Sequence, residues 1–486
     1  MSSYEKSVKP VSAFLAMIGL VIILATCLQV LKLPTRGTLV LCIVYLSVVT
    51  YFLGNTLKEI EGYLLDGFKK AAFTVGVLMA VGCVIGGWII GGVIPSIIYY
   101  GLDLLTPSLY LTTGLILCCL TSYFTGTSYG CIATMGVALI GVAEGLGVPL
   151  PIAAGMVVSG ALFGDKMSPF SDTTNLAAAT AKTTLFSHIY SMLFTGGPAI
   201  VISLIIFAVI GMNFGDSQGA SPAKTQELMA AIDSVFMISP FLLLIPAATI
   251  LLIIKKVPPI LSIMIGSILG VVAGMIFQDA FTAKEAVLAL FKGVSYDYGN
   301  ADAAKLLNRG GLGSMAWIVT VALIVLAFGE IIQRSGILKA LLTAISNSIN
   351  SSFRLIVATI GACLATNLFS ASQYVSIVLP GETFEPAYRR MNIKGNVLSR
   401  TLEDSGTLFA FLVPWGNDAI FTAATLGVAT LDYAPYAFFS LICPILAVLY
   451  AATGKFVWKR ENEEAADTPF DVTGQELVTA TVRTTE

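Results

Sequence analysis

The chain has 486 residues, of which 56% are hydrophobic and only 12% are charged, and its formal net charge is −2. Soluble domains carry about 25% charged residues, so this composition cannot cover a water-exposed surface and excludes an ordinary soluble protein. The near-neutral charge and the lack of a basic tract argue against a nucleic-acid partner, and the single histidine, His188, excludes an H-E-x-x-H zinc site.

Apolar stretches dominate the chain from its first residues onward. A helix needs about 20 mostly apolar residues to cross the hydrocarbon core of a bilayer. Ten stretches meet this requirement and are predicted to be transmembrane helices: 11–31, 35–54, 71–95, 150–181, 184–211, 236–254, 259–280, 313–333, 396–427 and 435–454. Two further apolar stretches, 109–146 and 354–388, are interrupted midway by small polar residues, which predicts two re-entrant hairpins.

The segments between these stretches are more polar. The amphipathic stretch 55–70 predicts a helix that lies at the membrane interface. The stretches 212–235 and 282–312 predict long polar loops, and the charged tail from Lys455 onward predicts a disordered segment.

The placement of lysine and arginine predicts the orientation, because short cytoplasmic loops carry an excess of both. With a cytoplasmic N-terminus and hairpins that enter and leave on one side, only the short loop with Lys32 and Arg36 is contrary. The other basic clusters then lie in the cytoplasm: Lys69/Lys70, Lys182, Lys255/Lys256, Arg334/Lys339, Arg389/Arg390/Lys394 and Lys455/Lys459/Arg460. We therefore predict a multi-pass protein of the cell membrane with about ten crossings and both termini in the cytoplasm.

The two halves of the chain align without a gap at an offset of 245 residues. Thr121–Tyr129 aligns with Thr366–Tyr374, and Pro169–Asp172 aligns with Pro414–Asn417. Five crossings are predicted between residues 71 and 313, and an odd number inverts the second half relative to the first. If 109–146 crosses the membrane instead of forming a hairpin, the repeat becomes parallel.

The expected fold is therefore an all-α integral membrane protein with two inverted-topology repeats, each with a broken helix and a re-entrant hairpin. The regions expected along the chain are N-terminal transmembrane helices with an interfacial helix (1–70), a first repeat (71–211), connecting helices and loops (212–312), a second repeat (313–454) and a cytoplasmic tail (455–486).

A dense group of polar residues divides the apolar stretch 150–181. Asp165, Lys166 and Asp172 all lie in it, and each charge at mid-membrane costs about 2.5–3.5 kcal/mol on insertion scales. Three such charges cannot face lipid, so the helix is predicted to open near Pro169 with its free backbone groups lining a cavity. The structural alternatives are interhelical hydrogen bonds alone and a mutual ion pair between Asp165 and Lys166.

The residues around this break offer oxygen ligands and neither sulfur nor imidazole, which suits a hard cation such as Na⁺. Asp172 and Asn175 are the predicted Na⁺ ligands, and a proton can compete for the same carboxylate. The candidate ion or substrate residues here are Asp165, Ser168, Ser171, Asp172, Thr173, Thr174 and Asn175. The second half adds Asp404 and Asn417, and the predicted hairpin tips add Thr125, Ser128, Asn367 and Ser372.

The run Gly164–Ala177 (GDKMSPFSDTTNLA) resembles the signature of the NhaC family of sodium/proton antiporters, which includes MleN-type malate/lactate antiporters. His188–Pro198, with one residue more before the proline than is usual in the family, is also similar, as are Leu402–Thr407 and Pro414–Asn417. The resemblance covers most of the chain and implies two inverted repeats with hairpins and broken helices. It also implies ion or substrate roles for Asp165, Ser168, Asp172, Thr173, Asn175, Asp404 and Asn417.

The expected function is Na⁺/H⁺ exchange by alternating access, with Na⁺ and H⁺ as transported ions and no cofactor. The alternative is a Na⁺- or H⁺-coupled exchanger of a small organic acid or amino acid, for which Lys166 or Arg400 supplies a fixed cation. An intramembrane protease is disfavoured because Leu162 replaces the first glycine of G-x-G-D, and the paired broken helices disfavour a channel. The expected partners are the lipid bilayer, a small cation and, in the alternative, an organic solute; a homodimer stays open.

Overall fold

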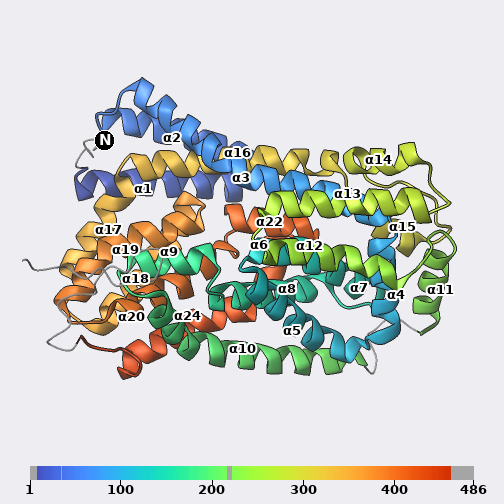
Figure 1. Ribbon diagram of the computed structural model, residues 1–486. Helices are drawn as coiled ribbons and strands as arrows, with labels where there is room; N and C mark the ends of the chain where they lie inside the picture. The colour runs from blue at the N-terminus through green and yellow to red at the C-terminus, as the bar shows by residue number, and fades with distance from the viewer. Residues whose placement is uncertain (1–7, 34, 216–221, 461–486) are drawn as a thin grey trace, which may run out of the picture.

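The computed structural model describes residues 8–33, 35–215 and 222–460, and helices make up almost all of this part of the chain (Figure 1). Its one isolated extended pairing is an antiparallel bridge between Ile393 and Lys459. The predicted all-α class is therefore confirmed for the described residues. Most of the tail predicted to be disordered, residues 461–486, lies outside them.

The first half and the connecting region contain fifteen α-helices in chain order: α1 (Pro10–Ala25), α2 (Thr35–Phe52), α3 (Leu57–Ile90), α4 (Val93–Leu104), α5 (Pro107–Thr125), α6 (Ser128–Cys131), α7 (Val137–Gly145), α8 (Leu150–Met167), α9 (Asp172–Thr180), α10 (Leu185–Gly215), α11 (Pro222–Asp233), α12 (Leu244–Ile254), α13 (Pro259–Phe277), α14 (Ala283–Lys292) and α15 (Ala301–Leu307). The second half follows with α16 (Leu312–Arg334), α17 (Ile337–Ser348), α18 (Ser352–Ser370), α19 (Gln373–Arg390), α20 (Gly395–Leu402), α21 (Leu408–Ala410), α22 (Asn417–Leu426), α23 (Thr430–Tyr433) and α24 (Phe438–Thr453). Short π- or 3₁₀-helical turns extend several of these: η1 (Thr26–Val30), η2 (Ile132–Gly136), η3 (Pro240–Leu243), η4 (Glu403–Thr407) and η5 (Ala434–Tyr436).

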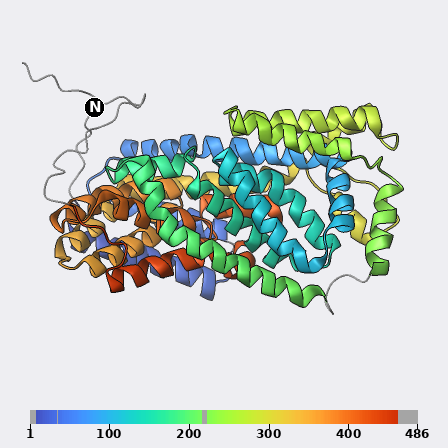
Figure 2. The same ribbon diagram turned by 60° about the horizontal axis from the view of Figure 1, so that its bottom comes forward.

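Seven helices of the described chain are long and apolar enough to cross a membrane, or eight if the bent pair Thr430–Tyr436 and Phe438–Thr453 forms one span. Apolar side chains are also exposed on the outside of the bundle. Along α10, for example, Val201, Ile205 and Val209 are each at least half exposed, and Figure 2 shows this helix on an outer face. Such a surface suits lipid rather than water. The count of ten crossings and the re-entrant course of the hairpins stay predictions.

The helices of the two halves begin at the same 245-residue offset that aligns the sequences. Helices α5 and α18 begin at residues 107 and 352 and have 19 residues each, and α9 and α22 begin at residues 172 and 417. The turn after each hairpin's first helix also matches, because Gly126 and Ala371 both have a left-handed backbone. In Figure 1, α5, α7 and α8 lie toward one end of the molecule, and α17 to α20 lie toward the other. The inverted orientation of the second half stays a prediction.

Two local predictions are wrong. The stretch 55–70 is not a separate interfacial helix, because residues 57–90 form one continuous helix, α3. A capping box of Thr56 and Glu59 starts this helix, and no proline interrupts it before Ile90. The regions predicted as loops, 212–235 and 282–312, contain the helices α11, α14 and α15.

Candidate functional site

The first broken helix opens where the sequence predicts. Helix α8 ends at Met167 and α9 begins at Asp172, with Ser171 as the cap that accepts a hydrogen bond from the Thr174 amide. The Thr174 hydroxyl donates to the carbonyl of Lys166 at 3.1 Å. Side chains of the break thus satisfy backbone groups that the helix leaves free.

The second broken helix opens at the equivalent place. Its first part runs through α20, η4 and α21 to Ala410, and α22 begins at Asn417. The Trp415 indole donates to the carbonyl of Leu368 at 2.7 Å and so ties this break to the helix α18. Phe170, which is 245 residues before Trp415, packs against the tip of the first hairpin. Each break is therefore held against the hairpin of its own half.

The contact at the first hairpin tip depends on a glycine. Gly126 has a φ of +66°, and a Cβ there would lie 2.8 Å from the Cβ of Phe170. We expect Gly126→Ala to destabilise the protein by about 1–3 kcal/mol, because it adds left-handed strain and pushes the break away from the hairpin. Thermal unfolding in detergent measures the loss. Gly197→Ala is the matched control, because a Cβ at Gly197 meets nothing within 4 Å; equal stability of the two variants would contradict the prediction.

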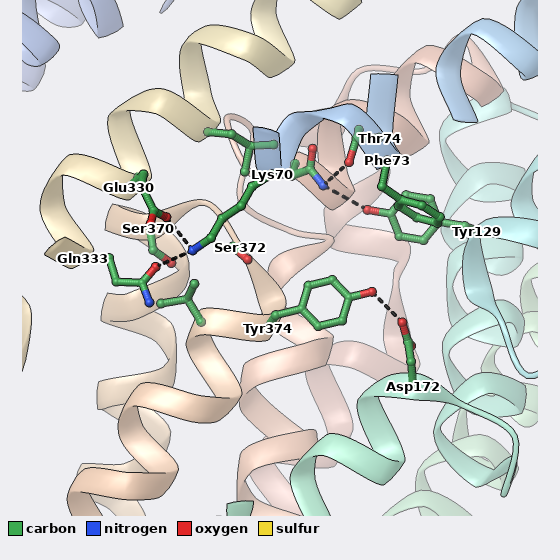
Figure 3. Close-up of a pocket in the computed structure, with 14 residues that line it drawn as sticks. Lys70, Phe73, Thr74, Tyr129, Asp172, Glu330, Gln333, Ser370, Ser372 and Tyr374 are labelled. Carbon is green, nitrogen blue, oxygen red and sulfur yellow. Dashed lines mark hydrogen bonds and ion pairs between the residues drawn. The ribbon is translucent and has the colours of Figure 1, made fainter. Parts of the chain in front are cut away.

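A cavity of about 460 Å³ lies between the two breaks and the helices α3 and α16 (Figure 3). Asp172 and Asn417, the first residues of α9 and α22, both line it. The tip of the second hairpin adds Ser370, Ser372 and Tyr374. The other lining residues are Lys70, Phe73, Thr74, Tyr129, Leu326, Gly329, Glu330, Gln333 and Val375. Two pairs of equivalent positions, Asp172 with Asn417 and Tyr129 with Tyr374, therefore line the cavity.

The carboxylate of Asp172 lies at the N-terminus of α9 and is exposed to the cavity. The Tyr374 hydroxyl donates to its Oδ2 at 2.6 Å, and the Thr173 amide donates to its Oδ1 at 2.8 Å (Figure 3). The positive end of the helix dipole adds a further favourable interaction with a negative charge. These contacts hold the carboxylate in place while leaving lone pairs free for a cation.

Asn417 lines the cavity from the other half, and its amide nitrogen is already engaged. That nitrogen donates to the Thr74 hydroxyl at 2.8 Å and to the Tyr129 hydroxyl at 3.2 Å. The Tyr129 hydroxyl in turn donates to Asp418 at 2.8 Å. The carbonyl oxygen of Asn417 and the hydroxyl of Ser370 have no hydrogen-bond partner among the described residues. Both are therefore available as oxygen ligands.

The opposite side of the cavity carries a positive charge. Lys70 on α3 donates to Glu330 at 2.5 Å and to Gln333 at 3.1 Å, both on α16 (Figure 3). Glu330 also accepts from Arg334 at 2.9 Å. From the sequence, Lys70 was expected only in a cytoplasmic basic cluster, and Glu330 was not expected at the site. The signal for Glu330 was its position as an acid inside the apolar stretch 313–333. A charge there is as costly to place in the membrane as the charges in 150–181.

The predicted site residues do not all reach this cavity. Asp172, Asn417 and Ser372 line it. Asn175, the second predicted Na⁺ ligand, is not among the lining residues, and its amide donates to the carbonyls of Pro169 and Ser171.

The other predicted residues make contacts within the breaks or the hairpins. Ser171 and Thr173 share a hydrogen bond of 3.1 Å, and Ser168 accepts from the Phe170 amide at 3.3 Å. Thr125 donates to the carbonyl of Thr121 in its own helix. Asn367 donates to the carbonyl of Gly406 at 2.7 Å, and the amide of Ser128 donates to Asp165 at 3.0 Å. The last two of these contacts each connect a hairpin to the broken helix of its own half.

The ion pair between Asp165 and Lys166, one of the two structural alternatives for this segment, is absent from the described structure. Consecutive residues of a helix point in different directions, so Lys166 faces the second half, where its ammonium donates to Asp404. Thr195 on α10 also donates to Asp404, at 3.0 Å. Lys166 and Asp404 are fully buried and do not line the cavity. They connect the two halves beside the cavity rather than within it.

Several known proteins are similar to this chain over most of its length. The model of the Na⁺/H⁺ antiporter family matches residues 160–455. The Na⁺/H⁺ antiporter NhaC of Alkalihalophilus pseudofirmus is 37% identical over 441 residues, which cover 90% of this chain and 95% of that protein. NhaC of Bacillus subtilis is 37% identical over 449 residues, which cover 92% of this chain and 99% of that protein. The malate-2H⁺/Na⁺-lactate antiporter of Bacillus subtilis is 36% identical over 410 residues, which cover 84% of this chain and 87% of that protein.

Proposed function

The chain belongs to the Na⁺/H⁺ antiporter family, and from this premise we propose that it exchanges Na⁺ for H⁺ across the cytoplasmic membrane. The observation that carries the proposal is the position of Asp172. Its carboxylate lies in a cavity between two broken helices and makes no ion pair with a described residue, whereas Glu330 in the same cavity is paired with Lys70 and Arg334.

Exchange follows from competition for this carboxylate. Na⁺ binds the ionised form, together with the carbonyl oxygen of Asn417 and nearby hydroxyls, and a proton binds the same oxygens in its place. Because the two ions exclude each other, each lowers the affinity for the other by the same factor. Movement of the broken helices against the rest of the bundle then exposes the site to alternate sides.

The test is Na⁺-driven proton movement in proteoliposomes that enclose a pH-sensitive dye. Adding Na⁺ outside should drive protons out of the vesicles, and adding choline at the same ionic strength should not. Absence of a Na⁺-dependent signal from well-folded protein would contradict the proposal.

A second candidate is coupled exchange of a small organic acid, and the size of the cavity favours it. A volume of about 460 Å³ lies in the range of small-molecule sites and far exceeds the roughly 30 Å³ that one water occupies. Lys70, which is paired with Glu330, is the lysine that lines the cavity, whereas Lys166 and Arg400 do not line it. Uptake of labelled malate or lactate by the same vesicles, without Na⁺/H⁺ exchange in their absence, would favour this candidate.

A further inference from the structure

A stripe of buried polar residues runs between α10 and the segment formed by α20 and η4. Two hydrogen bonds connect the two sides: Asn396 donates to Ser187 at 3.0 Å, and Thr195 donates to Asp404 at 3.0 Å. Both pairs are separated by 209 residues, so the two segments lie side by side in the same direction. One end of the stripe lies next to Thr184, which is exposed at the start of α10.

Many polar atoms in this stripe lack a hydrogen-bond partner in the described protein. On α10 they are both ring nitrogens of His188 and the hydroxyl of Ser191, and both side chains are fully buried. On the facing segment they belong to Asn396, Arg400, Glu403, Asp404 and Thr407. Buried polar atoms without protein partners are usually satisfied by water. The stripe therefore offers a path for protons through an otherwise apolar part of the bundle.

Glu403 lies toward the inner end of the stripe, one turn before Thr407, with none of its side chain exposed and neither carboxyl oxygen hydrogen-bonded. The basic groups around it have other partners. Lys166 donates to Asp404, and Arg400 donates to the carbonyl of Phe456 at 3.1 Å and lies over the Trp458 ring. A buried carboxylate without a partner is strongly disfavoured, so Glu403 holds a proton in this conformation.

The other charged and titratable groups near Glu403 are few. Lys166 and Asp165 on α8 act on it electrostatically, and the hydroxyls of Thr173 on α9 and Thr407 lie close to its carboxyl without a well-formed hydrogen bond to either oxygen. Cys443 on α24 lies beside the Lys166 ammonium at 3.9 Å. His188 on α10 lies close enough to Lys166 to feel the charge of its ammonium.

The backbone at Glu403 is also unusual. Residues 403–407 form the π-helical turn η4, a distortion that is frequent at functional sites. The equivalent residues of the first half, 158–162, lie in the regular helix α8. At this position of the repeat the π-helical turn and the two adjacent acids therefore occur in the second half and not in the first, whose own π-helical turn, η2, lies elsewhere at Ile132–Gly136.

We propose that Glu403 is a proton-binding site separate from the cavity, reached through the stripe, and that it carries a second proton in each cycle; this rests on the proposed Na⁺/H⁺ exchange. The O–H bond of the Glu403 carboxyl breaks to release a proton to water on one side of the membrane and forms again with a proton from the other. The neutral Lys166–Asp404 pair stays unchanged beside it. One proton at Asp172 and one at Glu403 then exchange for one Na⁺, so each cycle moves net charge.

The test compares wild type with Glu403→Gln in proteoliposomes whose membrane potential is set by K⁺ and valinomycin. Glutamine keeps the shape of a protonated glutamate, so we expect a folded protein. Wild type should exchange two protons per Na⁺ and respond to the potential, whereas the variant should exchange one and not respond. Glu382→Gln, which changes an exposed acid of α19, is the matched control and should behave as wild type.

Three results would overturn the assignment. A wild-type ratio of one proton per Na⁺ leaves no proton for Glu403, and this holds even if the variant fails to fold. A folded Glu403→Gln variant that keeps the wild-type ratio would place the second proton elsewhere. Wild type without any Na⁺-driven proton movement would instead contradict the proposed function itself, and this outcome differs from the other two.

Discussion

Replacing Asp172 with asparagine is expected to lower Na⁺-driven proton movement at least about 100-fold, which corresponds to about 2.7 kcal/mol of lost ion binding. The carboxylate is the ionisable group of the cavity that has no basic partner among the described residues, while Tyr374 and the Thr173 amide hold it in place. Asparagine keeps the size of the side chain but neither carries the charge nor exchanges a proton in this pH range. Folding and membrane insertion should be preserved, because a charge is removed from a partly apolar cavity. The measurement is dequenching of the pH dye after a Na⁺ jump.

The matched control is Asp432→Asn, which changes an exposed acid on α23 in the same conservative way. It should keep wild-type exchange. If Asp172→Asn retains pH-dependent exchange close to that of wild type, another group holds the shared ion, and Glu330 becomes the next candidate because it is the other carboxylate in the cavity.

The sequence predicted the two breaks well because the cause of each lies in the local residues. Three charges and Pro169 in an apolar stretch cannot continue as a lipid-facing helix, and the structure ends α8 at Met167. The 245-residue offset also has a local cause, since the same turns and caps recur at Gly126 and Ala371. Helix class, breaks and equivalent helix starts could therefore be inferred without coordinates.

The residues that line the cavity could be predicted only in part, because they depend on which distant segments of the chain meet. Asp172 and Asn417 were found from the breaks themselves. Lys70 and Glu330 were missed, since they are 260 residues apart and meet only when α3 and α16 pack side by side. The partner of Lys166 was missed for the same reason: its sequence neighbour Asp165 was an obvious acid, whereas Asp404 is 238 residues away.

The pair formed by Lys166 and Asp404 leads to the second large effect, on stability. Neither side chain is exposed, and removing one partner of a buried ion pair leaves an uncompensated charge that costs about 3–5 kcal/mol. We therefore expect Lys166→Met and Asp404→Asn each to destabilise the protein strongly. The double variant should be less destabilised than the sum of the two, because it leaves no charge stranded. Unfolding by denaturant in detergent, combined as a double-mutant cycle, measures the coupling.

The matched cycle pairs Lys166→Met with Asp165→Asn. Asp165 accepts a hydrogen bond from the Ser128 amide and makes no ion pair with Lys166 in the described structure, so the coupling in this cycle should be much smaller than in the first. A first cycle with coupling no larger than that of the second would show that Asp404 does not hold the ammonium. A large coupling in the Asp165 cycle alone would instead show that the Lys166 ammonium pairs with its sequence neighbour Asp165. The two cycles share one lysine variant, so any general effect of losing the Lys166 side chain cancels between them, and the difference reports which carboxylate the ammonium binds.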